Sequence, residues 1–415
     1  MENIIIKEDA TDRISELPDG IIENILLRLD KPKERVRVSV LSKKWFALTA
    51  SLPVSKFLFW DFVDEDWNSD NFYEYVKHTV SRFCRQQNVK IAHTFKLLTL
   101  VEDNIKLDFI DKCVELILLR GVKALDICFM KSRFSICPPM YCLPNILSSM
   151  STLTSLKISD CVMLPSSLMV GVVNLKSLKV LGLTRVPLNL HVIKRLSASP
   201  LLEELVVECC YGLTEFCVDG RLQNLKKLRF IDYKKNGIET IDIEAPNLCE
   251  CLLSVGQGRG STSVILDSCK QLRTLYLDGP FSPTLTGFSD FLSNFPFLEN
   301  LSLCLVNRRN ILAVSSPSLR NFMLYDECDP EEIDINTPNL RVFSYTNRWN
   351  CSKGKFIRES DSRELKTCLE CHIIINKVDT QICLECHIIN KVDTLWLLNN
   401  NFGSPSSLAC LDSML

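Results

Sequence analysis

The chain has 415 residues, enough for two or three ordinary domains or for one small domain followed by a long array of repeats. Its net charge is −2, with 48 lysines and arginines against 50 aspartates and glutamates, which excludes a strong global attraction to nucleic acid or to an anionic membrane. Apolar runs are too short for a membrane helix and the first residues lack a secretory signal, so we expect an intracellular protein of the nucleus or cytoplasm.

The stretch from Asp12 to Leu52 is typical of a small helical module. Apolar residues recur on one wide stripe of a first helix, which Pro18 can open and which Asp30-Lys31-Pro32 ends. A second amphipathic piece follows, and Ser42 can cap a third helix. A module of about forty residues cannot bury enough apolar surface to be stable alone. The exposed apolar ridge therefore needs a partner protein.

The module carries a family resemblance. It reads DRISELPDGIIENIL and then VSVLSKKW, which resembles the plant F-box, as in F-box/leucine-rich-repeat proteins and their FBD-type relatives. The resemblance implies an N-terminal tail over 1–11 and an F-box over 12–53 that binds a Skp-type adaptor and, through it, a cullin-RING ligase. A helical cap on a solenoid would also explain the apolar stripes, but it does not predict the VSVLSKKW block. One departure is the link from Leu29 to Arg35, which is one residue longer than usual, with its proline displaced. The resemblance implies these adaptor-binding residues: Leu17, Pro18, Ile21, Ile22, Ile25, Leu26, Leu29, Val40, Leu41 and Trp45.

After this module the chain repeats the unit Leu-x-x-Leu-x-Leu, a short strand whose first, fourth and sixth positions point into a core. Between Leu153 and Leu340 the copies begin 21 to 26 residues apart. This spacing predicts an α/β fold, in which the three-helix F-box precedes an irregular leucine-rich-repeat solenoid, or horseshoe, over residues 54–350. Clear copies begin at Leu153, Leu178, Leu202, Leu225, Leu272, Leu298 and Leu319, and weaker ones at Val54, Val122, Leu248, Leu340 and Val392, with another centred on Phe95.

Residues between these strands also follow patterns. Five prolines stand two residues before a strand's first leucine, where proline favours a turn into the strand. A cysteine or asparagine expected after the strand occurs in three copies, and amphipathic periodicity predicts four helical segments. Two stretches are expected to be loops. The prolines are Pro200, Pro246, Pro296, Pro317 and Pro338; the cysteine or asparagine is Cys161, Cys210 or Asn400; the helices are Asn71–Arg85, Ile105–Leu119, His191–Ser197 and Phe288–Ser293; the loops are Gly256–Ser263 and Asn347–Ser362.

One face of the predicted strands offers a surface for a target protein. Positions three, five and seven of each unit should line the concave face, where they mix charged, amide and aromatic groups. Alternatively, Glu204 and Glu208 only form ion pairs with Lys227 and Arg229 across neighbouring strands. Such surface ion pairs contribute little to stability. The predicted substrate-binding residues are Glu204, Lys227, Arg229, Tyr276, Asp278, Asn300, Asn321 and Tyr325.

Residues 351–391 read as a charged loop and a tandem-duplicated segment, and residues 392–415 as a last repeat strand and a tail. Two Cys-x-x-Cys pairs, Cys368/Cys371 and Cys383/Cys386, could bind zinc. The segments around them, TCLECHIIINKVDT and ICLECHIINKVDT, are nearly identical beyond what a metal requires, which favours a duplication. We therefore expect no metal, and we interpret the twenty cysteines mainly as small buried residues rather than disulfides.

No catalytic site is indicated, and we expect neither an enzyme nor a cofactor. None of the five histidines lies in a recognisable nucleophile context, and the glycines from Gly256 to Gly260 lack the lysine and serine of a phosphate loop. The first hypothesis is the substrate-recognition subunit of a Skp-cullin-F-box ubiquitin ligase, whose repeats hold an unknown protein target. One alternative is a leucine-rich-repeat scaffold that assembles no ligase, and a third is a zinc-binding protein.

Overall fold

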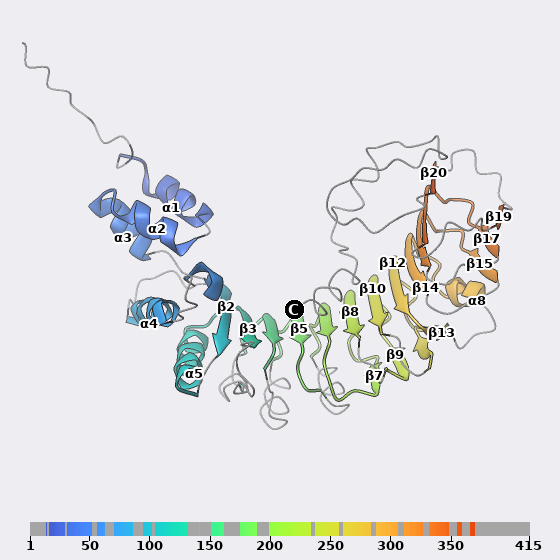
Figure 1. The fold of residues 1–415 in the computed structure, drawn as a ribbon, viewed down its shortest axis with the longest axis horizontal. Coiled ribbons are helices and arrows are strands. Elements are labelled where there is room, and N and C mark those ends of the chain that lie inside the picture. The colour runs from blue at the N-terminus through green and yellow to red at the C-terminus, as the bar shows by residue number, and fades with distance from the viewer. Residues whose placement is uncertain are drawn as a thin grey trace, which may run out of the picture. The chain divides into compact units, whose positions relative to one another are not determined.

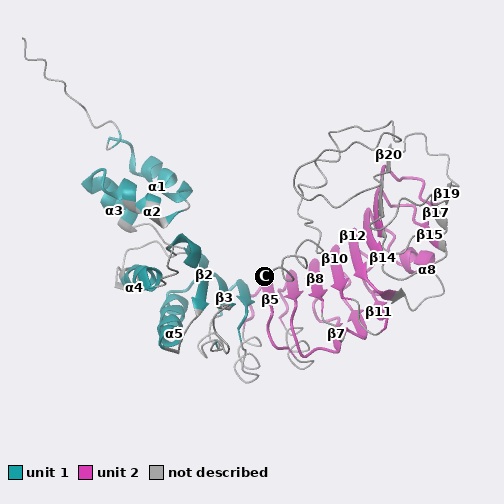
Figure 2. Ribbon diagram, viewed as in Figure 1, with its two compact units in different colours: residues 1–167 teal, residues 168–415 magenta. Residues whose placement is uncertain are grey.

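The protein is described here as a computed structural model. It describes residues 14–51, 56–62, 70–85, 94–131, 141, 151–161, 175–188, 199–283, 288–305, 311–326, 332–347, 355–358 and 366–369, with short gaps at 15, 30, 102–103, 234–236 and 257–259. The chain divides into two compact units, residues 1–167 and 168–415 (Figure 2). The predicted repeats over 54–350 contribute strands to both units.

Unit 1 begins with three short helices, as the sequence predicts. They are α1 (Asp19–Arg28), α2 (Pro32–Ser39) and α3 (Lys43–Ser51). Pro18 lies just before α1, and its carbonyl accepts the first helical hydrogen bond from the Ile21 amide at 2.9 Å. The backbone N–H of Trp45 donates to Ser42 Oγ at 3.3 Å, so the predicted cap of α3 is confirmed.

The rest of unit 1 is a parallel sheet in the order β1-β2-β3-β4 with two long helices. Both helices match the predicted ranges within one residue, and each buries apolar side chains such as Val76 and Val114. The described elements are β1 (Lys56–Leu58), a 3-10 helix (Phe59–Asp61), α4 (Asp70–Arg85), β2 (Thr94–Val101), α5 (Asn104–Leu119), β3 (Ala124–Lys131) and β4 (Ser155–Ser159).

Unit 2 is built on parallel strands in the order β5-β6-β8-β10-β12-β14-β16-β18-β20 (Figure 1). In this row, each strand from β5 to β18 begins two residues after the leucine that opens a predicted repeat. The solenoid fold is therefore confirmed. Its strands are β5 (Val180–Thr184), β6 (Glu204–Glu208), β8 (Lys227–Asp232), β10 (Glu250–Val255), β12 (Thr274–Gly279), β14 (Asn300–Leu305), β16 (Asn321–Asp326), β18 (Val342–Asn347) and β20 (Lys366–Leu369).

The return segments of unit 2 form strands of their own, which the sequence analysis did not predict. One sheet has the order β13-β11-β9-β7 and another the order β15-β17-β19. Figure 1 shows β7, β9 and β13 on one side of the row formed by β8, β10 and β12. These elements are β7 (Glu215–Val218), β9 (Thr240–Ile243), β11 (Thr262–Ile265), β13 (Phe281–Pro283), β15 (Ile311–Ser315), β17 (Glu332–Asn336), β19 (Lys355–Arg358) and the short helix α8 (Phe288–Ser293).

Both loop predictions are therefore wrong in part. The expected loop Gly256–Ser263 ends inside β11, and the expected loop Asn347–Ser362 contains β19. In both cases backbone pairing with the neighbouring repeat outweighs a polar local sequence. The predicted helix at Phe288–Ser293 is confirmed as α8, whereas His191–Ser197 and the strand from Val392 lie outside the described residues.

The repeat positions have the predicted environments. In β8 the core positions Leu228 and Phe230 are buried, as is Leu225 before the strand. Proline turns precede the strands: around Pro246, for example, the Leu248 amide donates to the Ala245 carbonyl at 3.1 Å. After the strands Cys161 and Cys210 are buried, and the predicted Asn400 lies outside the described residues.

Ten cysteines among the described residues form no disulfide, and five of them are buried. Burial raises the pKa of the Cys251 thiol, which disfavours the reactive thiolate. These residues therefore act as small apolar side chains, as the sequence predicts for the chain as a whole. Among the helices that the structure describes, none has both the length and the apolar character needed to cross a membrane.

Candidate protein-binding surfaces

The helical module closes around a small core of its own. Ile22 and Leu26 on α1 and Trp45 on α3 are buried against one another. The Trp45 indole Nε1 donates to the Ile14 carbonyl at 3.2 Å, and Lys44 Nζ donates to the Leu17 carbonyl at 2.6 Å. Three of the predicted adaptor-binding residues therefore support the module from inside, and two more pack against this core in part. These five are Ile22, Leu26 and Trp45, then Leu17 and Leu29.

The longer link after α1 is ordered by specific contacts. Pro32 occupies the first turn of α2, where its missing N–H costs nothing. Arg35 Nε donates to the Leu29 carbonyl at 2.8 Å, which ties the end of α1 to α2. The departure from the family pattern is thus accommodated by a helix that starts on the displaced proline.

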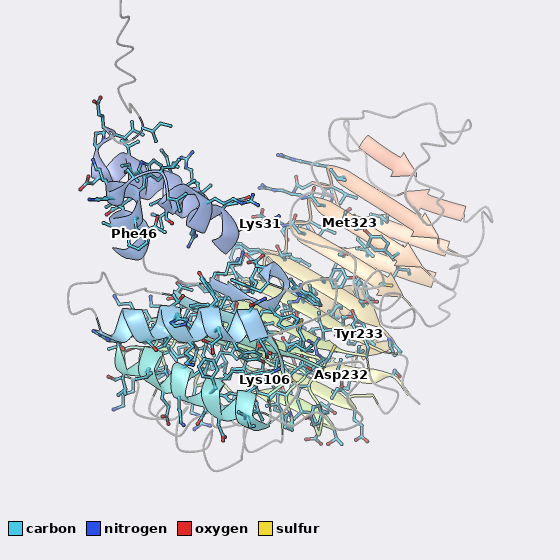
Figure 3. The ribbon with its side chains drawn as sticks, turned by 60° about the vertical axis from the view of Figure 1, so that its left-hand side comes forward. Lys31, Phe46, Lys106, Asp232, Tyr233 and Met323 are labelled. Carbon is cyan, nitrogen blue, oxygen red and sulfur yellow. The ribbon has the colours of Figure 1, made fainter. Side chains whose placement is uncertain are left out.

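Large apolar side chains are exposed on the surface of this module. Val40 is 79% exposed, between α2 and α3, and Phe46 projects from α3 (Figure 3). The sequence analysis missed Leu27 and Phe46; the signal was present, because both are large apolar residues off the core stripe of their helices. The members of this apolar surface are Ile14, Ile21, Ile25, Leu27, Val40, Leu41 and Phe46, and of the remaining predicted adaptor residues Pro18 is exposed beside them in sequence.

In unit 2 the predicted target-binding residues fall on one face of the sheet, here called the β6–β16 face. It consists of the first, third and fifth residues of β6, β8, β10, β12, β14 and β16, because the second and fourth residues point into the core. Parallel pairing aligns these positions in rows. One row is Glu208, Ile231, Ser254, Asp278, Cys304 and Tyr325.

Ion pairs cross the face between neighbouring strands. Arg229 Nε lies 2.5 Å from Glu208 Oε1, as the pairing alternative predicts. Lys227 Nζ lies 2.9 Å from Glu250 Oε2, so its partner is on β10 rather than on β6, where Glu204 lies. Hydrogen bonding to Glu250 raises the pKa of Lys227. The sequence analysis missed Glu250, although the weak repeat copy that begins at Leu248 has the right register to find it.

A ladder of polar side chains continues along the next strands. Asn300 Nδ2 donates to Thr274 Oγ1 at 3.2 Å, and Asn321 Nδ2 donates to Asn300 Oδ1 at 2.6 Å. The two predicted asparagines are thus brought together on adjacent strands and stabilise each other's orientation. Each amide keeps further hydrogen-bonding capacity, since an amide group has two donors and two acceptor sites.

The centre of the face combines a carboxylate, a hydroxyl and phenols. Ser254 Oγ donates to Asp278 Oδ2 at 2.7 Å and lies 3.4 Å from the Tyr233 hydroxyl. Tyr276 is only 8% exposed and packs with Ile231 and Leu252. Burial raises the pKa of Tyr276 above its usual value, and the charge of Asp278 adds to the rise. Figure 3 labels Asp232 and Tyr233 at the end of β8 and Met323 on β16.

Metal binding finds no support among the residues that the structure describes, where no group of three or more potential ligands comes together. Cys368 lies in β20, whereas Cys371, Cys383 and Cys386 are outside the described residues. The hypothesis that the two Cys-x-x-Cys pairs bind zinc therefore stays untested.

Comparison with known proteins places this architecture in a family. The family model described as At1g61320/AtMIF1, LRR domain, matches residues 86–304, which is more than half of the chain. The chain belongs to this family. The match covers the region from before β2 to β14, so leucine-rich repeats are identified both in unit 1 and in unit 2.

Similar proteins occur in Arabidopsis thaliana. At5g54820, named as an F-box/LRR-repeat protein, is 31% identical over 229 residues, or 52% of this chain and 46% of that protein. The F-box/FBD/LRR-repeat protein At5g44980 is 26% identical over 322 residues, or 74% of this chain and 71% of that protein. At5g56390, named as an FBD-associated F-box protein, is 25% identical over 366 residues, or 85% and 80%.

These names confirm the resemblance that the N-terminal blocks carry, including the FBD-type relatives. The chain spans about half the length of the first of these relatives, 46% of At5g54820. None of the three names states an enzymatic activity.

Proposed function

We propose that this protein is the substrate-recognition subunit of a Skp-cullin-F-box ubiquitin ligase. The helical module binds a Skp-type adaptor and the β6–β16 face binds a target protein. The receptor forms no covalent bond itself; it holds the target at high local concentration near the conjugating machinery.

The observation that carries this proposal is the apolar surface of the helical module. Its core already contains Ile22, Leu26 and Trp45, so the exposed apolar side chains are not needed to close it. Several exposed large apolar side chains on so small a module favour a protein partner. The relatives are named as F-box proteins, which supports an adaptor as the partner.

Val40 offers the sharpest test, because a surface residue can be changed without disturbing the core. We expect Val40→Asp to lower capture of a purified plant Skp-type adaptor by at least about tenfold, since a buried unpaired carboxylate would cost several kcal/mol at the interface. The matched control is Ile105→Asp on α5, because Ile105 is 81% exposed and Val40 79%. We expect Ile105→Asp to bind the adaptor as the wild type does.

The same measurement separates the proposal from a leucine-rich-repeat scaffold that assembles no ligase. If the wild-type protein does not capture the adaptor, or if Val40→Asp and the wild type capture it equally, the ligase proposal is defeated. Hydrogen exchange over residues 14–51 should be unchanged in Val40→Asp, which shows that any loss of binding comes from the surface.

A further inference from the structure

We infer that the β6–β16 face binds a basic segment of its target, and that the Asp278 carboxylate receives an arginine or lysine side chain of that segment. This inference rests on the proposed function and deepens it, because it gives the chemical class of the target.

The charge of the face is the first observation. Its positions carry four carboxylates and two cations, which gives 2 − 4 = −2. Both cations are already held by carboxylates of adjacent strands, at 2.5 Å and 2.9 Å. A partner surface of positive charge is therefore favoured over an acidic one or a nucleic acid. The carboxylates are Glu204, Glu208, Glu250 and Asp278, and the cations are Lys227 and Arg229.

The setting of Asp278 is the second observation. Ser254, which is 0% exposed, donates to one carboxylate oxygen at 2.7 Å and so fixes the orientation of the group. In the aligned row its two neighbours are Ser254 and Cys304, both small side chains. A carboxylate that is oriented by a buried hydroxyl and flanked by small residues can be reached by a long side chain with a cationic end.

Aromatic groups near Asp278 supply the third observation. Tyr276 lies two residues before Asp278 on the same face, and Tyr233 approaches Ser254. Besides burial, the charge of Asp278 raises the pKa of both Tyr276 and Tyr233, so these two phenols lie near the carboxylate. The ring of Tyr233, which is 36% exposed, can attract a cation through its face and pack against the methylene stem of lysine or arginine. The combination is selective for a basic side chain rather than for a bare metal ion.

The test uses a defined probe, a phage-displayed library of random 12-residue peptides selected on the 415-residue chain. We expect peptides with arginine or lysine to be enriched by at least about tenfold over the input library. Asp278→Asn should lose this enrichment while keeping the fold, because the amide oxygen still accepts from Ser254. Asp278→Glu keeps the charge and should retain it. The matched control is Asp267→Asn, which removes an exposed carboxylate from the turn before β12, outside the face.

Two results would overturn the inference: basic peptides that are not enriched on the wild-type protein, or equal enrichment on the wild type and Asp278→Asn. Adaptor capture is measured on the same preparations. Normal adaptor capture without basic selection defeats the basic-segment inference alone. Basic selection without adaptor capture defeats the ligase proposal alone.

Discussion

The indole Nε1 of Trp45 donates a hydrogen bond to the backbone carbonyl of Ile14, 31 residues earlier in the chain, at 3.2 Å. The bond ties α3 to the segment that leads into α1, while the ring packs on Ile22 and Leu26. A single side chain therefore joins the two ends of the helical module. Its neighbour Phe46 is exposed, so of these two adjacent aromatic residues one lies in the core of the module and the other on its surface.

Trp45→Ala should unfold the helical module in a large fraction of molecules. Removal of a buried tryptophan costs about 3–5 kcal/mol, which is comparable with the whole stability of so small a module. Hydrogen exchange of α1 and α3 amides measures the loss, and Phe46→Ala is the control, with exchange expected to stay slow. Equal exchange in the two variants would contradict the assignment of Trp45 to the core.

A second prediction concerns the close approach of two repeats at Gly279. Its φ is +131°, and an added Cβ would run into the carbonyl oxygen of Val255 on the preceding repeat. Gly279→Ala should destabilise the repeats around β12 by about 1–3 kcal/mol, from strain alone. Gly260→Ala is the control, because a Cβ there meets nothing within 4 Å. Urea unfolding of the full chain compares the two, and equal midpoints would show that the approach is not tight.

The ion pairs on the β6–β16 face should differ in strength. Glu208 and Arg229 are 26% and 35% exposed, whereas Lys227 and Glu250 are 55% and 50% exposed. We expect a coupling energy of about 0.5–1 kcal/mol for the first pair and a smaller one for the second, because water and salt screen exposed charges. Double-mutant cycles with alanine, read from hydrogen exchange of β8, measure both. A larger coupling for Lys227 and Glu250 would contradict this order.

The strands of the solenoid could be predicted because their signal is local and repeated. Leu225, Leu228 and Phe230 show the pattern: the spacing in sequence identifies a strand, and all three side chains are buried. The return strands carry a weaker signal. In β9 only Ile241 and Ile243 face the core, and the strand exists because its backbone pairs with β7 and β11. Such pairing depends on neighbouring repeats, which a single window of sequence does not show.

The site was predictable in composition but not in pairing. Alternation along the strands places Lys227, Arg229 and Asp278 on one face, as the structure shows. The partners depend on rotamers and on which strand lies next, so Lys227 pairs with Glu250 rather than Glu204. Burial of Tyr276 was also missed, because it depends on Ile231 and Leu252 from two other strands.

The last prediction is a loss of stability in alkaline solution that depends on Tyr276. Burial raises the pKa of its phenol, and Asp278, Cys304, Tyr233 and Tyr325 act in the same direction. Above pH about 10 an unfolded tyrosine releases its proton while folded Tyr276 keeps it. The unfolded state then binds fewer protons, so stability is fully present below pH about 10 and falls as pH rises above it.

Tyr276→Phe should remove this contribution. Between pH 10 and 11 the free energy of unfolding of the variant should fall by about 1 kcal/mol less than that of the wild type. Urea unfolding followed by circular dichroism measures both slopes, and the interval from pH 7 to 8 is the control, where the two slopes should agree. Burial also raises the pKa of Tyr233, so the variant should still lose some stability in alkaline solution. Identical slopes above pH 10 would show that Tyr276 ionises as readily in the folded protein as in the unfolded chain.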